Sequence, residues 1–403
     1  MVISIHKLAR ILIAAAFVAV PFALPQCAMA DEPATTQAPA ATRAEALKLI
    51  EGGATFLLKA QQPDGSFVPQ QAPVGMNALV LKALAQAPGY GYAHPSVKKG
   101  FDKLLSFQAE SGGIYKDSLA NYNTAIAISA LASADSPELS PAIQKAMTYL
   151  KSLQWSDSIV GPQGEKIDSN HPWAGGWGYG GLSRGPGRPD LSNTQMAIEA
   201  LHDAGLKEND PAYKDAIKFV TRLQNSSETN DQPWAGDDGG FVYSPAADGK
   251  GESMASEYVG PAGQRMLRSY GSMSYAGLKS MIYAGLSKDD PRVKAAWNWI
   301  RSNWTLDENP GVRAGDPANA KQGMYYYYHT MARALRAYGE DDIVDADGVH
   351  HDWRAELVKK LASLQNPDGS WSGERRWMED NPILTTSYVV LAMEEVIAPT
   401  TDK

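Results

Sequence analysis

A short acidic and polar segment, DLSNT at 190–194, contains residue types that could perform acid chemistry or bind a ligand. It opens an apolar helix, and a similar sequence, NYNT, opens another. Asp190 would precede the first helical turn, whose free N–H groups its carboxylate can accept. Such bonds favour the ionised form and lower the pKa, so we expect Asp190 mainly as a helix cap. Ligand contact stays open for it and for three neighbours at matching helix starts: Ser192, Asn193 and Asn123.

A second pair of acids, Asp237 and Asp238, precedes two glycines within a long Gly- and Ser-rich insertion at 226–268. Paired carboxylates on a loop can act as acid and base or hold a cation. An Asp can also bond the backbone of its own turn, as we expect for Asp64 and Asp368 in similar turns. The pair is therefore kept both as candidate catalytic residues and as turn residues.

His329 lies in the aromatic sequence YYYYHTMARAL and is the third candidate catalytic residue. A histidine here could transfer protons, contact a ligand, or bond a buried neighbour. Four successive tyrosines cannot all face one way on a helix. We expect Tyr328, together with Tyr275 of another helix, to line a cavity, where aromatic faces can stabilise cations.

A repeated turn punctuates the whole chain and defines the elements that would position these residues. LKAQQPDGSF near the start and LASLQNPDGSW near the end are two copies, and weaker copies lie between them. Each copy is a helix end with a Gln, then a turn, then Gly before an aromatic residue. In such turns Pro sets the first corner, Asp bonds its own backbone, and Gly accepts a positive φ. The repeated glutamines are Gln61, Gln108, Gln154, Gln224 and Gln365.

Two sets of helices alternate between these turns. One set is amphipathic, with Lys and Glu on one face, and is expected at about 43–61, 95–109, 139–154, 210–225, 290–304 and 352–365. The other set is apolar on most sides, and is expected at about 75–86, 119–133, 190–204, 270–285, 322–338 and 384–396. A helix that is apolar on most sides must be buried, and an amphipathic helix can shield it from solvent with its own apolar face. We therefore predict an all-α toroid of six inner and six outer helices, a single domain at 43–403 with the insertion lying over one mouth.

The N-terminus is expected to be a secretory signal peptide over residues 1–30. Lys7 and Arg10 precede an apolar stretch that is broken by proline, and Ala28-Met29-Ala30 resembles a cleavage site. A lipid anchor at Cys27 is less favoured, and no transmembrane span is expected. Residues 31–42 are expected to be a disordered Pro/Ala/Thr tether.

The composition limits the partners. The net charge of −8 and the absence of a basic tract disfavour a nucleic-acid partner. Cleavage after Ala30 would remove the single cysteine and thus any thiolate ligand. Export without cysteine fits a periplasmic or extracellular protein, and neither a metal nor a cofactor is expected.

The Gln–turn–Gly–aromatic repeats resemble the QW motifs of squalene and hopene cyclases, and the layout of six pairs resembles one barrel of those enzymes and the β-subunit of protein prenyltransferases. This resemblance covers about 43–396 and implies the toroid fold. In cyclases that protonate an alkene, the motif Asp-x-Asp-Asp-Thr opens an inner helix. Here Asp190 matches the first acid and Thr194 the threonine, while Ser192 and Asn193 replace the other two acids.

The prenyltransferase zinc site, built from Asp, Cys and His, can be compared in the same way. The sequence YYYYHT resembles its Tyr-His-Thr helix, with His329 in the histidine position, whereas Tyr270 and Ser272 stand where Asp and Cys are expected. The resemblance therefore implies an isoprenoid or other apolar ligand in a central cavity, without the usual acid or zinc ligands. Two alternatives stay open: a non-catalytic binding or scaffold protein, and a glycan-active enzyme with the same barrel.

Overall fold

The computed structural model describes residues 35–180, 185–245 and 250–401, and these residues are mostly helical. Twelve α-helices occur within them, each overlapping a range expected from the sequence. The outer helices are α1 (Ala40–Lys59), α3 (Pro95–Leu105), α5 (Ser140–Ser152), α7 (Pro211–Thr221), α9 (Pro291–Ser302) and α11 (Trp353–Ser363). The inner helices are α2 (Val74–Gln86), α4 (Ala120–Ser133), α6 (Leu191–Asp203), α8 (Gly271–Tyr283), α10 (Met324–Tyr338) and α12 (Pro382–Ile397).

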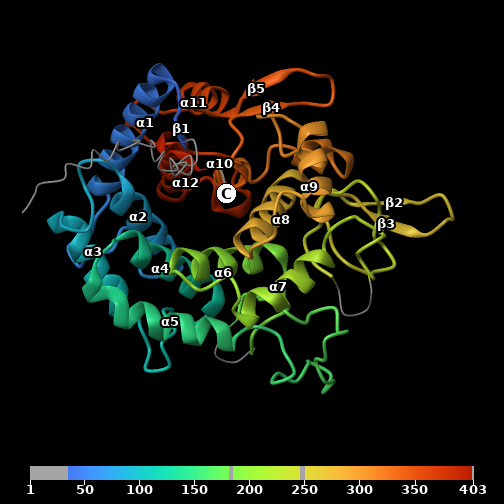
Figure 1. Cartoon of the computed structure of the whole chain (residues 1–403). Coiled ribbons are helices and arrows are strands. Elements are labelled where there is room, and N and C mark those ends of the chain that lie inside the picture. Colours follow the sequence, from blue (N-terminus) through green and yellow to red (C-terminus); the bar gives the residue numbers. More distant parts are fainter. Residues whose placement is uncertain (1–34, 181–184, 246–249, 402–403) are drawn as a thin grey trace, which may run out of the picture.

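The six inner helices form a closed ring (Figure 1). Each inner helix contacts the next inner helix along the chain, and the last, α12, contacts the first, α2. The outer helices pack around them and bury narrow stripes, as α3 does with Val97, Gly100, Phe101 and Leu104 at helical spacing. The predicted all-α toroid of six inner and six outer helices is confirmed.

Four of the five repeated glutamines join their turn to the next outer helix. The side-chain amide of Gln154 donates to the carbonyl oxygens of Gly175, in its own turn, and Ala212, in the first turn of α7, both at 2.9 Å. Gln61, Gln108 and Gln224 donate in the same way to their own turn and to α3, α5 and α9. The repeat thus links neighbouring helix pairs by hydrogen bonds.

The similar openings of α4 and α6 have a structural explanation. Thr194 Oγ1 accepts the backbone N–H of Trp177 at 3.0 Å, and Thr124 Oγ1 accepts that of Ile114 at the same distance. Equivalent bonds connect Phe67 with Asn77, Phe241 with Ser274, and Trp371 with Thr386. Each of these inner-helix side chains satisfies a buried donor that the preceding turn leaves free.

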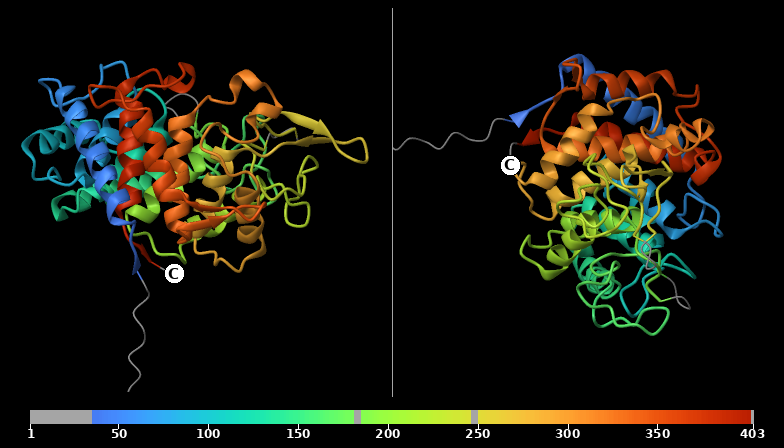
Figure 2. Two further views of the ribbon diagram at one scale, coloured as in Figure 1. Left: turned by 90° about the horizontal axis from the view of Figure 1, so that it is seen from above. Right: turned by 90° about the vertical axis from the view of Figure 1, so that its right-hand side faces the viewer.

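Short two-stranded sheets are attached to the helical ring. The strands β2 (Glu257–Val259) and β3 (Arg265–Leu267) form a hairpin in the 226–268 insertion that projects from one side of the ring (Figure 2). A second hairpin, β4 (Asp342–Val344) with β5 (His350–Asp352), leads into α11, whose N-terminus Asp352 caps.

The segment expected to be a tether joins the fold earlier than predicted. The strand β1 (Thr35–Thr36) pairs with β6 (Thr400–Thr401), and α1 already begins at Ala40. Pairing with the C-terminal strand supplies backbone partners that composition alone does not reveal. The expected signal peptide and residues 31–34 lie outside the described residues. Among those described, no helix is long and apolar enough to cross a membrane.

Candidate functional site: an aromatic chamber and a charged cluster

A cavity of about 310 Å³, here called the aromatic chamber, lies at the N-terminal ends of the inner helices. All six inner helices contribute to it, and Tyr243 and Met254 come from the insertion. Its aromatic wall consists of Tyr122, Tyr179, Tyr243, Tyr270, Tyr326, Trp377 and Tyr388. The remaining lining residues are Pro73, Met76, Leu119, Ser192, Met196, Met254, Ser272, Met273, Asn309, Gln322, Gly323, Met378, Glu379 and Leu384.

Ser192, one of the ligand-binding candidates, lines this chamber. Its hydroxyl lies 3.2 Å from the Tyr326 hydroxyl, which also accepts a hydrogen bond from the Gln195 amide at 3.2 Å. A serine hydroxyl is far too weak an acid to protonate an alkene. This part of the wall can therefore orient a ligand by hydrogen bonding.

Asp190 is the N-cap of α6, as expected. Its Oδ1 accepts the backbone N–H of Asn193 at 2.8 Å, and its Oδ2 accepts the Asn193 side-chain amide at 2.9 Å. The expected lowering of its pKa is wrong: burial raises the pKa of Asp190 to about 6, despite the opposing hydrogen bonds. Asp190 is not among the residues that line the chamber.

The two candidate asparagines have structural partners instead of facing the chamber. Asn193 is held by Asp190 and accepts a bond from Asn121 at 3.3 Å. Asn123 accepts the backbone N–H of Gly75 at 2.7 Å and donates to the carbonyl oxygen of Ser118 at 3.0 Å. These bonds fix the starts of α2, α4 and α6 relative to one another.

The candidate acids of the insertion occupy a turn outside the chamber. Asp237 is exposed, and its Oδ1 accepts the backbone N–H of Ser227 at 2.7 Å. Asp238 accepts the N–H of Gly240 at 2.9 Å and the hydroxyl of Ser269 at 2.6 Å. Asp64 and Asp368 make the matching bond in their own turns. The geometry therefore supports the turn interpretation and not the catalytic one.

The two tyrosine candidates do not line the chamber. Tyr275 is buried and packs edge-on against Tyr327. Tyr328 donates its hydroxyl to the carbonyl oxygen of Leu306 at 2.7 Å. The residue of this helix that does face the chamber is Tyr326, because the helix turns by about 100° per residue.

His329 lies deeper in the ring, in a narrow space of about 30 Å³ that it shares with Glu199 and Tyr388. Its ring stacks on that of Tyr388 at 5.5 Å, and its Nδ1 has no hydrogen-bond partner. Burial lowers the pKa of His329 to about 3, against the opposing charge of Glu199. It is therefore neutral near pH 7 and could not serve as an imidazolium acid in the catalytic role considered for it.

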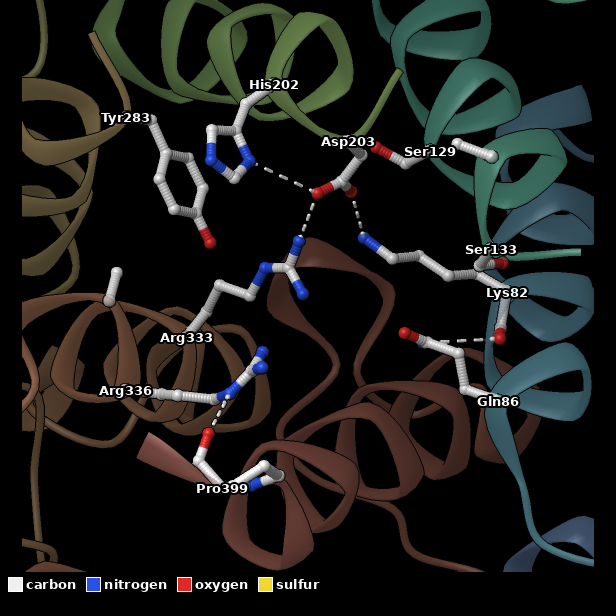
Figure 3. A pocket seen from close by; sticks show the side chains of 12 residues that line it. Lys82, Gln86, Ser129, Ser133, His202, Asp203, Tyr283, Arg333, Arg336 and Pro399 are labelled. Carbon is white, nitrogen blue, oxygen red and sulfur yellow. Dashed lines mark hydrogen bonds and ion pairs between the residues drawn. The ribbon is translucent and has the colours of Figure 1, made fainter. Parts of the chain in front are cut away.

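A charged cluster lies at the opposite end of the ring, where the inner helices have their C-termini. Figure 3 shows four of its members, Lys82, Asp203, Arg333 and Arg336, around a pocket. Lys82 Nζ lies 2.7 Å from Glu199 Oε1 and 3.0 Å from Asp203 Oδ2, and Lys279 also pairs with Glu199. Arg333 pairs with Asp203 and with Glu395, whose other oxygen pairs with Arg336 at 2.8 Å. We define the cluster as Lys82, Glu199, Asp203, Lys279, Arg333, Arg336, Glu394 and Glu395.

These charges border a second cavity, of about 280 Å³, whose lining includes Lys82, Asp203, Arg333 and Arg336. Burial alone would raise the pKa of Glu199, but the neighbouring cations hold it well below its usual range. The cluster comes from α2, α6, α8, α10 and α12, and so connects five inner helices. We assign it a structural role because its charges are largely paired with one another.

The sequence reasoning missed two features. Glu379, in the loop before α12, is buried in the chamber wall, and its Oε1 accepts the backbone N–H groups of Tyr325 and Tyr326, both at 2.9 Å. No periodicity or motif marks it. The charged cluster did leave a signal, namely isolated Lys, Arg and Glu residues within otherwise apolar helices.

Comparisons with known proteins agree with this architecture. Residues 68–244 match the squalene-hopene cyclase C-terminal domain family. No curated protein sequence matches the chain. The type II terpene cyclase MstE from Scytonema, solved with geranylgeranyl dihydroxybenzoate, is similar over 89% of this chain and 98% of its own, with 14% identity and a TM-score of 0.53.

Glycan-active proteins share the fold equally well. A novel alpha-amylase from Clostridium perfringens is similar over 87% of this chain and 98% of its own, with 13% identity and a TM-score of 0.52. An unsaturated glucuronyl hydrolase specific for heparin covers 88% of this chain and 97% of its own, with 12% identity and a TM-score of 0.54. Such identities establish a common fold and leave the activity to be argued from the site.

Proposed function

We propose that this chain, a prenyltransferase- and squalene cyclase-like superfamily member, binds an isoprenoid or a similarly elongated apolar molecule in the aromatic chamber. The observation that carries the proposal is the chamber itself, about 310 Å³ in volume and walled mainly by Tyr, Met and Leu side chains. Transfer of apolar ligand surface from water to such a wall contributes roughly 25 cal/mol per Å². MstE, with the same fold, is solved with a geranylgeranyl-bearing substrate.

The same lining favours an apolar ligand over a glycan. An oligosaccharide carries many hydroxyl groups, each of which needs a polar partner once buried. The non-tyrosine polar side chains of the chamber lining are few: Ser192, Ser272, Asn309, Gln322 and Glu379. Asn309 and Ser272 already bond each other, at 3.1 Å. We therefore place the glycan-active alternative second.

We favour binding over the acid-initiated cyclisation that the resemblance suggests. Ser192 replaces the proton donor in the chamber wall, and Asp237 and Asp238 lie in an outer turn. A transporting or sequestering role needs only the chamber, since affinity depends on burial and shape.

A direct test of the proposal is to fill the chamber with a larger side chain. In Met273→Trp the larger side chain should occupy the space between α8 and its neighbours, and the binding of tritiated geranylgeraniol in equilibrium dialysis should weaken at least ~10-fold. The matched control, Ser133→Trp, places the same side chain in the cavity beside the charged cluster and should leave binding unchanged. The absence of saturable binding to the wild type, or equal binding by Met273→Trp, would contradict the proposal.

Mass spectrometry of organic extracts from the purified protein provides an independent test. A co-purifying polyprenyl or triterpene species would support the proposal. An oligosaccharide released by denaturation would favour the glycan alternative.

We also propose that the protein is exported by cleavage after Ala30. The support is the basic start with Lys7 and Arg10, the apolar stretch and the Ala28-Met29-Ala30 site. N-terminal sequencing of the protein from a bacterial periplasmic fraction should begin at Asp31. An intact Met1 in a cytoplasmic fraction would argue against export.

A further inference from the structure

The loop before α12 has an unusual backbone at the chamber mouth. Trp377 and Met378 both adopt left-handed conformations, with φ of 62° and 64°. Such conformations are costly for residues other than glycine, and they cluster at ligand clamps and active sites. Both residues line the chamber, although their side chains are 52% and 45% exposed. Neither burial nor helix formation accounts for an exposed Trp–Met pair held in this way.

The next residue, Glu379, extends from this strained pair into the wall. It is 1% exposed, and its Oε1 is occupied by the N–H groups of Tyr325 and Tyr326. Its Oε2 is buried and has no hydrogen-bond partner. An unpaired buried carboxyl oxygen is costly, and a polar group supplied by a ligand could satisfy it after a small rotation of the carboxyl.

The charges around the chamber restrict what that polar group can be. Among the described lining residues, none is Lys, Arg or His, and Glu379 is the only carboxylic acid. A diphosphate buried here would lack a cationic partner and would lie near a carboxyl group. The lining therefore suits a ligand with an uncharged polar end.

We propose that Glu379 recognises the polar end of the ligand by a hydrogen bond from its free carboxyl oxygen to an uncharged ligand oxygen, such as a hydroxyl or an ether. Trp377 and Met378 cover the adjacent part of the ligand at the mouth. This inference rests on the proposed binding of an isoprenoid and adds the class of isoprenoid: a neutral, oxygen-bearing one and not a prenyl diphosphate.

The protonation of Glu379 makes the contact sensitive to pH. Burial raises the pKa of Glu379 to about 7, against the backbone N–H groups of α10 that it accepts. With Oε1 occupied by these donors, the proton resides on Oε2, where it can be donated to a ligand oxygen. Above this pKa the ionised carboxylate can only accept and would repel an ether oxygen.

The titratable groups packed against Glu379 do not reproduce this behaviour, and Asp190, whose pKa burial raises to about 6, does not line the chamber. Burial raises the pKa values of Tyr325 and Tyr328 on α10 and of Tyr388 on α12, so these phenols stay neutral from pH 5.5 to 8.5. The charged neighbours within the loop are Glu374, Arg375, Arg376 and Asp380, all of them exposed.

The test compares three probes that share one C20 chain: geranylgeranyl methyl ether, which can only accept a hydrogen bond, the corresponding hydrocarbon, and geranylgeranyl diphosphate. In the wild-type protein, the ether should bind about 5- to 10-fold more tightly at pH 5.5 than at pH 8.5, since one hydrogen bond is gained. The hydrocarbon should show no such change. At pH 7 the diphosphate should bind at least ~10-fold more weakly than the ether.

The variant Glu379→Gln tests whether the pH dependence of ether binding arises from Glu379. The amide keeps an acceptor for the α10 N–H groups and a donor for the ligand, so the affinity for the ether should remain but become independent of pH. Glu374→Gln, an exposed neighbour, is the matched control and should behave as the wild type. The comparison of ether with hydrocarbon uses the wild type alone, so it stands even if Glu379→Gln folds poorly.

The outcomes separate this inference from the proposed function. If no probe binds saturably, the proposed function fails. If the ether and the hydrocarbon respond equally to pH, if Glu379→Gln keeps the pH response of the ether, or if the diphosphate binds most tightly, the chamber still binds isoprenoids but the recognition by Glu379 is overturned.

Discussion

The two ends of the ring are built from the same inner helices but provide opposite environments. At the N-terminal ends, Tyr, Met and Leu side chains surround the open aromatic chamber. At the C-terminal ends, Lys82, Arg333 and Arg336 pair with carboxylates from other inner helices. The chamber offers apolar surface to a ligand, whereas most charges of the cluster are paired with one another. We conclude that ligand binding and ring closure are separated along the axis of the toroid.

The direction of the helices explains part of this division. The free N–H groups at a helix N-terminus stabilise acids, and the free carbonyl groups at a C-terminus stabilise cations. Asp190 and Glu379 accept first-turn N–H groups of α6 and α10 beside the chamber. The cations of the cluster lie near the C-terminal ends, where they offset both the carbonyl groups and the nearby carboxylates.

The largest expected effect is at the charged end. Arg333→Met leaves Asp203 and Glu395 buried with fewer cationic partners, and should lower the free energy of unfolding by about 3–5 kcal/mol in urea titrations. Arg188→Met, which breaks the more exposed pair with Glu252, should cost about 0–1 kcal/mol. Unchanged affinity for geranylgeraniol in the folded Arg333 variant would support the separation of the two ends, and a large loss of affinity would break it.

The two ends should also differ in how their stability depends on pH. Glu199, Asp203 and Glu395 have lowered pKa values, so their stabilisation is present above their unfolded pKa values and is lost as the pH falls through the folded ones. Glu379, with its pKa raised to about 7, contributes stability below its unfolded pKa that is lost as the pH rises through 7.

Urea unfolding at pH 3, 5.5 and 8 should therefore show a maximum near pH 5.5. In Glu379→Gln, the decrease between pH 5.5 and 8 should shrink by on the order of 1–3 kcal/mol. Part of the decrease should remain, because burial also raises the pKa values of Asp190 and Glu394. Stability that rises steadily from pH 3 to 8 would contradict this assignment.

A smaller effect is expected where the repeat turns meet the inner ring. Thr194→Val keeps the side-chain shape but removes the acceptor of the Trp177 N–H, and should cost about 1–2 kcal/mol of unfolding free energy. Thr194→Ser, which keeps the hydroxyl, is the control and should recover most of the loss. Equal stability of the Val variant and the wild type would show that this bond is dispensable.

The smallest effect is expected for the acids first considered for catalysis. Asp237→Asn should change the free energy of unfolding by less than ~0.5 kcal/mol and leave geranylgeraniol affinity unchanged, because its carboxylate bonds an exposed loop amide. A clear loss of affinity would mean that the insertion reaches the ligand through this turn.

The architecture could be read from the sequence because local rules govern it. The alternation of amphipathic and apolar helices, and the five glutamines before their turns, predicted all twelve helices and the ring. Asp190 as a cap followed from its position before a helix. These features depend on neighbours within a few residues or on a repeat, and both are visible along the chain.

The candidate site was harder to predict, because it depends on which side chains the closed ring brings together. Tyr275 and Tyr328 were expected in the cavity and Asn123 was a ligand-binding candidate, yet hydrogen bonds and packing direct them elsewhere. Tyr326 faces the cavity instead. The pKa of Asp190 rises because burial outweighs its hydrogen bonds, and burial cannot be judged before the ring is closed.

The sequence by itself determined the helices, their turns and the order of inner and outer layers, because periodicity and turn chemistry are local. Only the tertiary structure decided where the apolar chamber lies, that Glu379 from a loop enters its wall, and that charges from five helices gather at the opposite end. These are contacts between residues as far as 308 positions apart along the chain, as between Gln86 on α2 and Glu394 on α12, and ring closure alone makes them neighbours.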